Sequence, residues 1–137
     1  MLTLTVLSPE RKLVDGLQIQ SLMVTGSEGL IQILPEHAEM IGTIETGPFS
    51  YSPVSGEAVA GVISTGFFEI KGHQVIVMAE TCELSKEIDV SRAKVAQKKA
   101  ESALSDPELD NKLFRKYELK LQRSLIRQQI AGKTTLH

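Results

Sequence analysis

The period of the apolar residues changes once along this chain, near Leu84. Before that point, apolar and polar residues alternate in short runs between glycines and prolines, as in LTLTV at residues 2–6. A period of two is typical of half-buried strands, whereas after residue 84 alanines recur at spacings of three and four, as on one face of a helix. The sequence therefore predicts a β-domain over residues 1–84 and a helical part over residues 85–137.

Eight or more short strands are expected in the first part. Because no helical pattern lies between them, we expect an antiparallel β-sandwich or flattened barrel rather than a parallel sheet. Asp15 and Gly16 are expected to separate two of these strands, and Gly72 to lie in a hairpin turn. The expected strands cover residues 2–6, 13–14, 17–24, 30–34, 40–44, 49–51, 58–64, 67–71 and 74–79.

Residues 24–47 contain two turn signals close together. Gly26 and Gly29 enclose a Ser-Glu pair, and glycine reaches positive φ at little steric cost, so a tight reversal between two strands is expected. Pro35 has no amide proton to give to a strand ladder and is expected to end the second strand. The residues that follow it are expected to form an exposed, irregular loop.

The second part predicts an antiparallel hairpin of two helices, at about residues 89–104 and 107–131. Asp89 is expected to cap the first helix, and Asp106 with Pro107 to start the second. One face of the first helix consists of Ala93, Ala96, Ala100 and Ala103. An alanine face permits close approach of another helix but buries little area, so we expect it to be held weakly.

The second helix carries an apolar row and a basic row, displaced by roughly 100° about the helix axis. A solvated face would explain the basic row, but five like charges on one stripe repel one another and favour an acidic partner surface. The apolar row consists of Leu109, Leu113, Tyr117, Leu121 and Leu125. The basic row consists of Lys112, Lys116, Lys120, Arg123 and Arg127.

Charge is divided unequally between the two parts. The net charge is −2, but residues 1–84 hold 3 Lys or Arg against 10 Asp or Glu, and residues 85–137 hold 12 against 7. This asymmetry indicates separate partners or two domains. The acidic first part and the lack of clustered aromatic residues argue against a nucleic-acid-binding protein.

The sequence contains no recognisable enzyme or metal signature. There is no Walker motif, paired-carboxylate signature or dinucleotide glycine run. His37 and His73 lack metal-ligand spacing, and Cys82 has no base arrangement around it. No apolar run approaches the roughly 18 residues of a membrane span, and no leader for secretion or import is recognised. We therefore expect a non-catalytic adaptor or regulator that requires no cofactor.

Three short motifs resemble one known family. TGSEG at residues 25–29, ILP at 33–35 and HA at 37–38 are similar to the signature loop of the epsilon subunit of F-type ATP synthases, with Glu36 and Glu39 where the family usually has Gly and Pro. The resemblance implies a non-catalytic central-stalk subunit of a proton-translocating complex, which couples rotation of the c-ring to the catalytic head through gamma. The rotor contacts that it implies, to the c-ring and gamma, are Ser27, Glu28, Gly29, Leu30 and His37.

The start of the first expected helix, IDVSRA at residues 88–93, is similar to a pattern at which some epsilon subunits bind ATP. The resemblance implies ATP as a possible regulatory ligand. Helix capping by the aspartate explains that residue without any ligand, so both interpretations stay open. The implied nucleotide-binding residues are Asp89, Arg92, Lys99 and Arg115.

In the same family the two helices lie folded on the sandwich or extend into the catalytic head and block ATP hydrolysis. The resemblance therefore implies that the basic row contacts acidic segments of beta, with alpha nearby, in the extended state. It also implies a peripheral location at the cytoplasmic face of a bacterial inner membrane, reached only through the complex. The alternative is an ATP-sensing regulatory or scaffold protein that acts outside a rotary ATPase.

Overall fold

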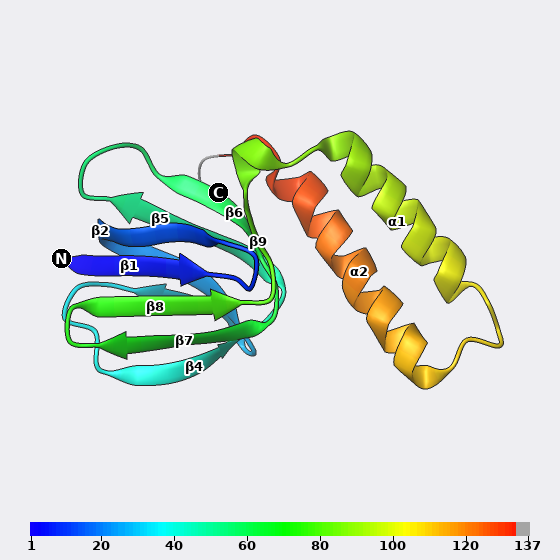
Figure 1. Ribbon diagram of the computed structural model, residues 1–137, viewed down its shortest axis with the longest axis horizontal. Coiled ribbons are helices and arrows are strands. Elements are labelled where there is room, and N and C mark those ends of the chain that lie inside the picture. The colour runs from blue at the N-terminus through cyan, green and yellow to red at the C-terminus, as the bar shows by residue number, and fades with distance from the viewer. Residues whose placement is uncertain (134–137) are drawn as a thin grey trace.

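The computed structural model describes residues 1–133, and its elements change from strands to helices after Leu84 (Figure 1). The strands are β1 (Leu2–Leu7), β2 (Lys12–Gly26), β3 (Gly29–Ile33), β4 (Met40–Ile44), β5 (Gly47–Pro53), β6 (Val59–Ile63), β7 (Gly66–Lys71), β8 (Gln74–Ala79) and β9 (Cys82–Leu84). A 3₁₀ turn, η1 (Ser85–Glu87), leads to the helices α1 (Val90–Leu104) and α2 (Asn111–Ile130).

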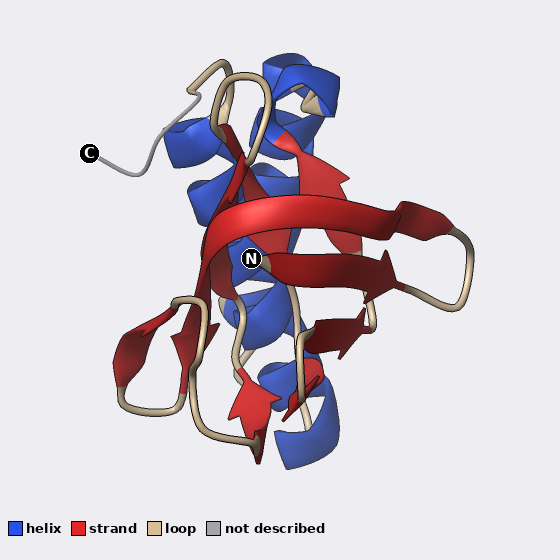
Figure 2. Cartoon of the chain, turned by 90° about the vertical axis from the view of Figure 1, so that its left-hand side faces the viewer, coloured by secondary structure: helices blue, strands red, loops and turns tan. Residues whose placement is uncertain are grey.

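The strands form one hydrogen-bonded sheet that folds over on itself into a sandwich (Figure 2). Their order is β4-β7-β8-β1-β2-β5-β6-β9, and β3 pairs with β2 beside this path. All pairs are antiparallel except β1 with β8, where Leu4 lies opposite Val75. The predicted β-sandwich followed by two helices is therefore confirmed, with one parallel pair that the short strand spacing did not indicate.

The predicted break at Asp15 and Gly16 is wrong, because β2 runs without interruption from Lys12 to Gly26. Gly16 has a φ of 64°, and the register of β2 against β1 shifts between Leu4 and Val6. The glycine thus produces a local bulge and lets the long strand bend while its pairing continues on both sides. The tight reversal at Gly26 is confirmed, since Gly29, with a φ of 117°, lies directly opposite it.

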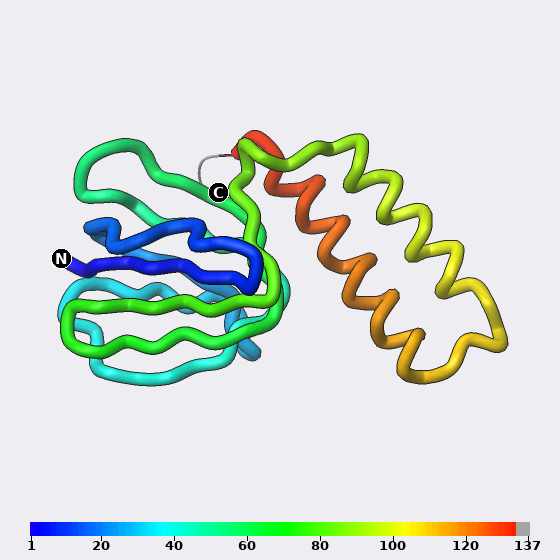
Figure 3. Tube along the Cα trace, viewed as in Figure 1, coloured from blue at the N-terminus to red at the C-terminus, as the bar shows by residue number. Residues whose placement is uncertain are grey.

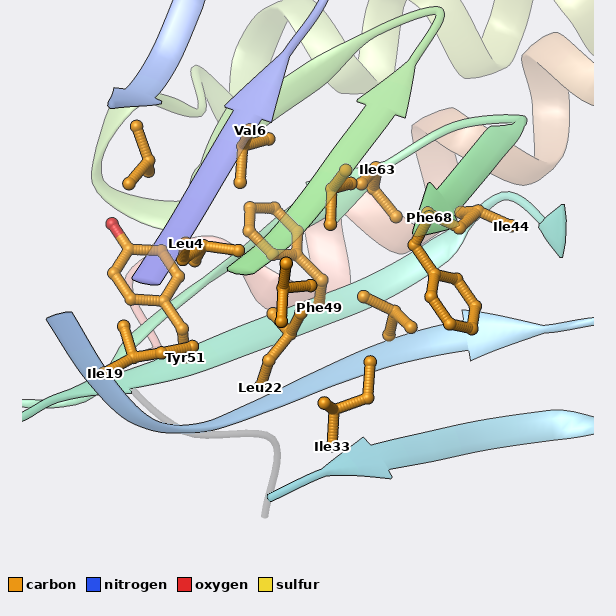
Figure 4. Packing of buried hydrophobic residues seen from close by; sticks show 14 of the residues in the cluster. Leu4, Val6, Ile19, Leu22, Ile33, Ile44, Phe49, Tyr51, Ile63 and Phe68 are labelled. Carbon is orange, nitrogen blue, oxygen red and sulfur yellow. The ribbon is translucent and has the colours of Figure 1, made fainter. Parts of the chain in front are cut away.

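The core lies between the two halves of the folded sheet (Figure 4). Phe49 and Phe68 are its largest fully buried side chains, and both are 0% exposed. Alternate residues of β1 point into this core, as the alternation in its sequence predicts, and alternate residues of β8 point into it as well. Cys82 of β9 is also buried there, so the core includes the last strand before the helices.

The first helix begins as predicted and the second does not. Asp89 is the N-cap of α1 and accepts a hydrogen bond from the Arg92 amide at 3.2 Å. The cap of α2 is Asp110, which accepts from the Leu113 amide at 2.8 Å, so the predicted start at residues 106–107 is wrong. Asp106 instead accepts from the amide two residues on, which is the local bond of an Asx turn.

The helices form an antiparallel hairpin, with α2 between the sandwich and α1 (Figure 1). Ala93 and Ala100 of α1 are buried at 0% and 1% exposure, and Ser124 of α2 is 1% exposed. Gln128 donates to the side-chain oxygen of Gln97 at 2.8 Å across the pair. Small side chains thus let the two helices approach closely while burying little apolar area.

A small apolar cluster attaches the hairpin to the sandwich. Ile130 at the end of α2 is 4% exposed and packs with Ala60 and Val62 of β6. Ile88 and Ile126 complete this cluster, which is separate from the sandwich core. The chain leaves the sandwich and returns to it at this one place, where the Gly132 amide donates to the Ser85 carbonyl at 3.4 Å (Figure 3).

Two ion pairs flank the same junction. Arg127 of α2 donates twice to Glu83 of β9, at 2.9 and 3.3 Å, and their side chains are only 18% and 31% exposed. Arg11, in the turn after β1, donates twice to Glu87 of η1, both at 2.9 Å. These hydrogen bonds hold the pKa of the Glu87 carboxyl below its ordinary value.

We expect Ile130→Ala to loosen the hairpin while the sandwich stays folded. The substitution removes the largest buried contact of the junction and leaves a cavity, which typically costs about 2–5 kcal/mol for a buried Ile. Hydrogen exchange of the α1 and α2 amides should accelerate while the β-strand amides stay protected. Leu125→Ala, at a position 46% exposed, is the matched control and should change neither. Equal acceleration in the strands would contradict a separately attached hairpin.

Acid should weaken the Arg11–Glu87 pair. Because the folded-state pKa of Glu87 is depressed, its contribution to stability is present above the unfolded pKa of about 4.3 and is lost as the pH falls through the folded value. The unfolding free energy of Arg11→Met should therefore decline less steeply below about pH 4.5 than that of the wild type. Lys12→Met, whose pair with Asp15 is exposed and 3.6 Å long, should keep the wild-type slope.

Candidate functional site

The residues predicted to contact the rotor lie in two separate segments. Ser27 and Glu28 form the β2–β3 turn, and Gly29 and Leu30 begin β3. This segment lies beside the loop after β4, because the Glu45 amide donates to the Thr25 carbonyl at 2.9 Å. His37 precedes β4, and therefore lies toward the other end of that strand. Leu30 is 54% exposed, so an apolar side chain faces outward at the turn. The structure does not bring the two segments into one patch.

The loop around His37 has a strained backbone. Glu36 has a φ of 68°, the left-handed conformation that glycine adopts easily and that costs a residue with a Cβ about 1–2 kcal/mol. The reversal is closed by the His37 amide, which donates to the Leu34 carbonyl at 3.1 Å. The side chains of Leu34 and Glu36 are exposed, and Leu34 is 48% accessible.

The basic row faces the sandwich and α1 as well as solvent. Arg127 is paired with Glu83, and the Lys120 ammonium lies 5.5 Å from the centre of the Tyr117 ring. Lys112, Lys116 and Arg123 line grooves along α2 and have no carboxylate within 4.0 Å among residues 1–133. Three grooves border this helix, and Arg123 contributes to all of them.

The first groove lies between the end of α2, β9 and the start of α1, and its volume is about 510 Å³. Arg92, Arg123 and Arg127 line it together, so three guanidinium groups from two helices converge there. The groove is also lined by Arg11 and by four glutamates, which are Glu10, Glu80, Glu83 and Glu87. Local sequence rules do not place Arg11 beside Glu83, Glu87 or the helix arginines, since 71 or more residues lie between Arg11 and each of them.

The four predicted nucleotide-binding residues do not share one groove. Arg92 lines the first groove, and Asp89 is engaged as the helix cap. Lys99 lines a second groove, of about 440 Å³, between the two helices. Arg115 lines a third, between α2 and the sandwich, and pairs with Glu118 at 3.8 Å. Arg92 and Lys99 each share a groove with Arg123 and Arg127 of α2, but the two grooves are different.

The apolar row of α2 is only partly covered. Tyr117 and Leu121 are half-buried on the side of α1, whereas Leu113 and Leu125 are 39% and 46% exposed. Phe114 adds a further exposed ring, at 43%. The hairpin therefore exposes apolar side chains to solvent. An isolated helix pair does not require such exposed side chains, and a partner surface would cover them.

Further observations limit the chemistry of residues 1–133. No group of three or more His, Cys, Asp or Glu side chains in this part is placed to hold a metal ion. Burial raises the pKa of the Cys82 thiol, which favours the unreactive protonated form. Neither α1 nor α2 has the length and apolar character needed to cross a lipid bilayer.

Comparison with known proteins matches both parts of the chain. Residues 1–85 match the family model of the ATP synthase delta/epsilon chain beta-sandwich domain, and residues 86–132 match that of its long alpha-helix domain. Among solved structures, a chain of the Euglena gracilis mitochondrial ATP synthase (OSCP/F1/c-ring) has a TM-score of 0.79 at 18% identity, covering 90% of this chain and 77% of its own. A chain of the Tetrahymena thermophila central stalk/c-ring has a TM-score of 0.56 at 15% identity, covering 98% and 96%.

Curated relatives match along nearly the whole chain. The ATP synthase epsilon chain of Trichlorobacter lovleyi is 38% identical over 130 residues, covering 95% of this chain and 93% of the relative. That of Geobacter sulfurreducens is 35% identical over 132 residues, covering 96% and 94%. That of Dehalococcoides mccartyi is 30% identical over 136 residues, covering 99% and 96%. The chain therefore belongs to the epsilon-subunit family of F-type ATP synthases.

Proposed function

We propose that this epsilon subunit works in the central stalk of a proton-translocating ATP synthase, where it helps couple c-ring rotation to the catalytic head through gamma. The observation that carries the proposal is the contrast between its two parts. The sandwich has a continuous core around Phe49 and Phe68, whereas the hairpin is attached through Ile130 and two ion pairs. A rigid part suits a permanent contact, and a weakly attached part suits a movable one.

The permanent contact is proposed for the sandwich. Its exposed turn at Ser27 to Leu30 and its loop at His37 lie toward opposite ends of β4, so each can meet a different surface of the rotor. The similar chains of known structure come from assemblies described as OSCP/F1/c-ring in one case and as central stalk/c-ring in the other. We assign one segment to the c-ring and the other to gamma. No enzymatic step is assigned to the chain itself, which acts as a regulatory subunit at the membrane only through the complex.

The movable contact is proposed for the hairpin, as an inhibitor of ATP hydrolysis. Moving the hairpin exposes Ile130 and breaks the pair of Arg127 with Glu83. The free-energy cost of these two changes is a few kcal/mol, which the binding of a partner can offset. In the extended state the basic row would meet acidic segments of beta, with alpha nearby. The exposed Leu113, Phe114 and Leu125 would be covered in the same movement.

ATP is proposed as a regulatory ligand of the first groove. Arg92 of α1 and Arg123 of α2 both line it and have no carboxylate within 4.0 Å among residues 1–133, and guanidinium groups are well suited to phosphate oxygens. A ligand that bridges α1 and α2 beside the junction would favour the arrangement described for this chain. The phosphate chain is assigned to these arginines, with Asp89 at the adjacent helix start and Lys99 in the neighbouring groove between the helices.

A chain that ends at Leu84 should assemble with the complex and support proton-coupled ATP synthesis, while ATP hydrolysis by the complex rises. The sandwich core lies within residues 1–84, so removing the hairpin leaves it complete. Hydrolysis and ATP-driven proton pumping are measured on membranes reconstituted with the full or the shortened chain. Unchanged hydrolysis would contradict the inhibitory role, and loss of assembly would contradict the role of the sandwich as the permanent contact.

Calorimetric titration of ATP into the full chain should show binding that Arg92→Ala weakens by roughly tenfold, because it removes one charge-assisted phosphate contact. Lys98→Ala, at an exposed position of α1 outside the three grooves, removes the same charge and should leave the affinity unchanged. Equal weakening by both variants, or no binding by the wild type, would rule out the first groove as the nucleotide site.

A further inference from the structure

A third groove, between α2 and the sandwich, is unusually cationic. Its volume is about 360 Å³. One wall is α2, which contributes five cations: Lys112, Arg115, Lys116, Lys120 and Arg123. The other wall consists of the loops that follow β4, β6 and β8, and its one carboxylate is that of Glu80. The proposed first-groove nucleotide site shares Glu80 and Arg123 with this groove, but it includes neither the loops that follow β4 and β6 nor the first two turns of α2.

The cations in this groove are poorly neutralised. Arg115 pairs only with the exposed Glu118 of its own helix, at 3.8 Å. Glu80 lies more than 4.0 Å from every Lys and Arg nitrogen of residues 1–133, and it accepts a hydrogen bond from the Thr65 hydroxyl at 3.3 Å. Lysines at positions 112, 116 and 120 follow one another at a spacing of four on the helix, where like charges repel. A bound anion would relieve this repulsion.

The facing loops add neutral hydrogen-bond donors. Thr46 and Ser64 are both 7% exposed, and Thr65 lies beside them. Ser64 is committed to Thr81, at 2.6 Å between their hydroxyl oxygens, which fixes the loop. The Thr46 hydroxyl makes no hydrogen bond with another group of the described chain, so it is available to a ligand. Hydroxyls opposite cations are the donors that phosphate oxygens accept from.

The chemistry of the walls selects the class of anion. Among residues 1–133, no aromatic side chain lines the groove for a nucleobase to stack on, and Leu119 is its one apolar lining residue. Its volume lies at the lower end of the range for small-ligand sites, about 300–1,000 Å³. We propose that this groove binds a multivalent phosphate anion, as pyrophosphate or as the phosphate chain of a nucleotide, and that the bound anion connects α2 to the sandwich. The proposal does not depend on the inhibitory role of the hairpin.

The test is calorimetric titration of pyrophosphate into the full chain at low ionic strength. We expect one binding site, with an affinity for pyrophosphate that falls as salt is added. The double variant Lys112→Gln with Lys116→Gln should lower this affinity by about tenfold or more. Lys94→Gln with Lys98→Gln is the matched control, because it removes the same charge from an exposed face of α1 that borders none of the grooves. Circular dichroism verifies that both variants keep their helices.

Amide shifts measured by NMR locate the anion. Pyrophosphate should shift the amides of Thr46 and Thr65 together with those of the first two turns of α2, and Thr46→Val should weaken binding several-fold. Parallel titrations with inorganic phosphate and ATP decide which anion the groove prefers. If the site holds only the phosphate chain, the nucleoside of ATP should add nothing to the affinity. The proposal would be overturned if pyrophosphate did not bind or if the control variant weakened binding equally. It would also be overturned if the shifts were confined to the Arg92 region, or if an acidic peptide bound and pyrophosphate did not.

Discussion

The small contact between the end of α2 and the last strands of the sandwich determines how this molecule is arranged. Ile130 is buried on β6 and Arg127 is paired with Glu83 of β9, while the chain enters and leaves the hairpin at the same place through Ser85. Because the anchor lies at one end of a 20-residue helix, a small change there is amplified into a large displacement of the other end.

The same anchorage explains which charged side chains of the hairpin form ion pairs with the sandwich. The acidic sandwich and the basic hairpin attract one another, yet only Arg127 forms a close pair across the α2 interface. Lys112, Lys116 and Arg123 of α2 border grooves and have no carboxylate within 4.0 Å among residues 1–133, so attraction at a distance orients α2 without fixing it tightly. The cations of α2 can therefore exchange contacts with the sandwich for contacts with another protein, because no buried network of ion pairs has to be broken.

Pattern and turn chemistry predicted most of the fold. The alternation in β1, the glycine turn at Gly29 and the cap at Asp89 follow from local rules, and all three are found. Local rules failed where two signals competed. Gly16 resembles a strand end but produces a bulge, because pairing with β1 continues on both sides, and Asp106 resembles a cap but closes a turn before Asp110.

The sequence by itself determined the two-part division, the strands and helices, and which residues carry charge, because each depends on neighbours within a few positions. Only the tertiary structure decided which charges meet. Arg11 and Glu87 are 76 residues apart and form a two-bonded pair, and Arg92 converges with the arginines of α2 while Arg115 lines another groove. The rotation of α2 about its axis is set by the burial of Ile130, and no periodicity within the helix specifies that contact.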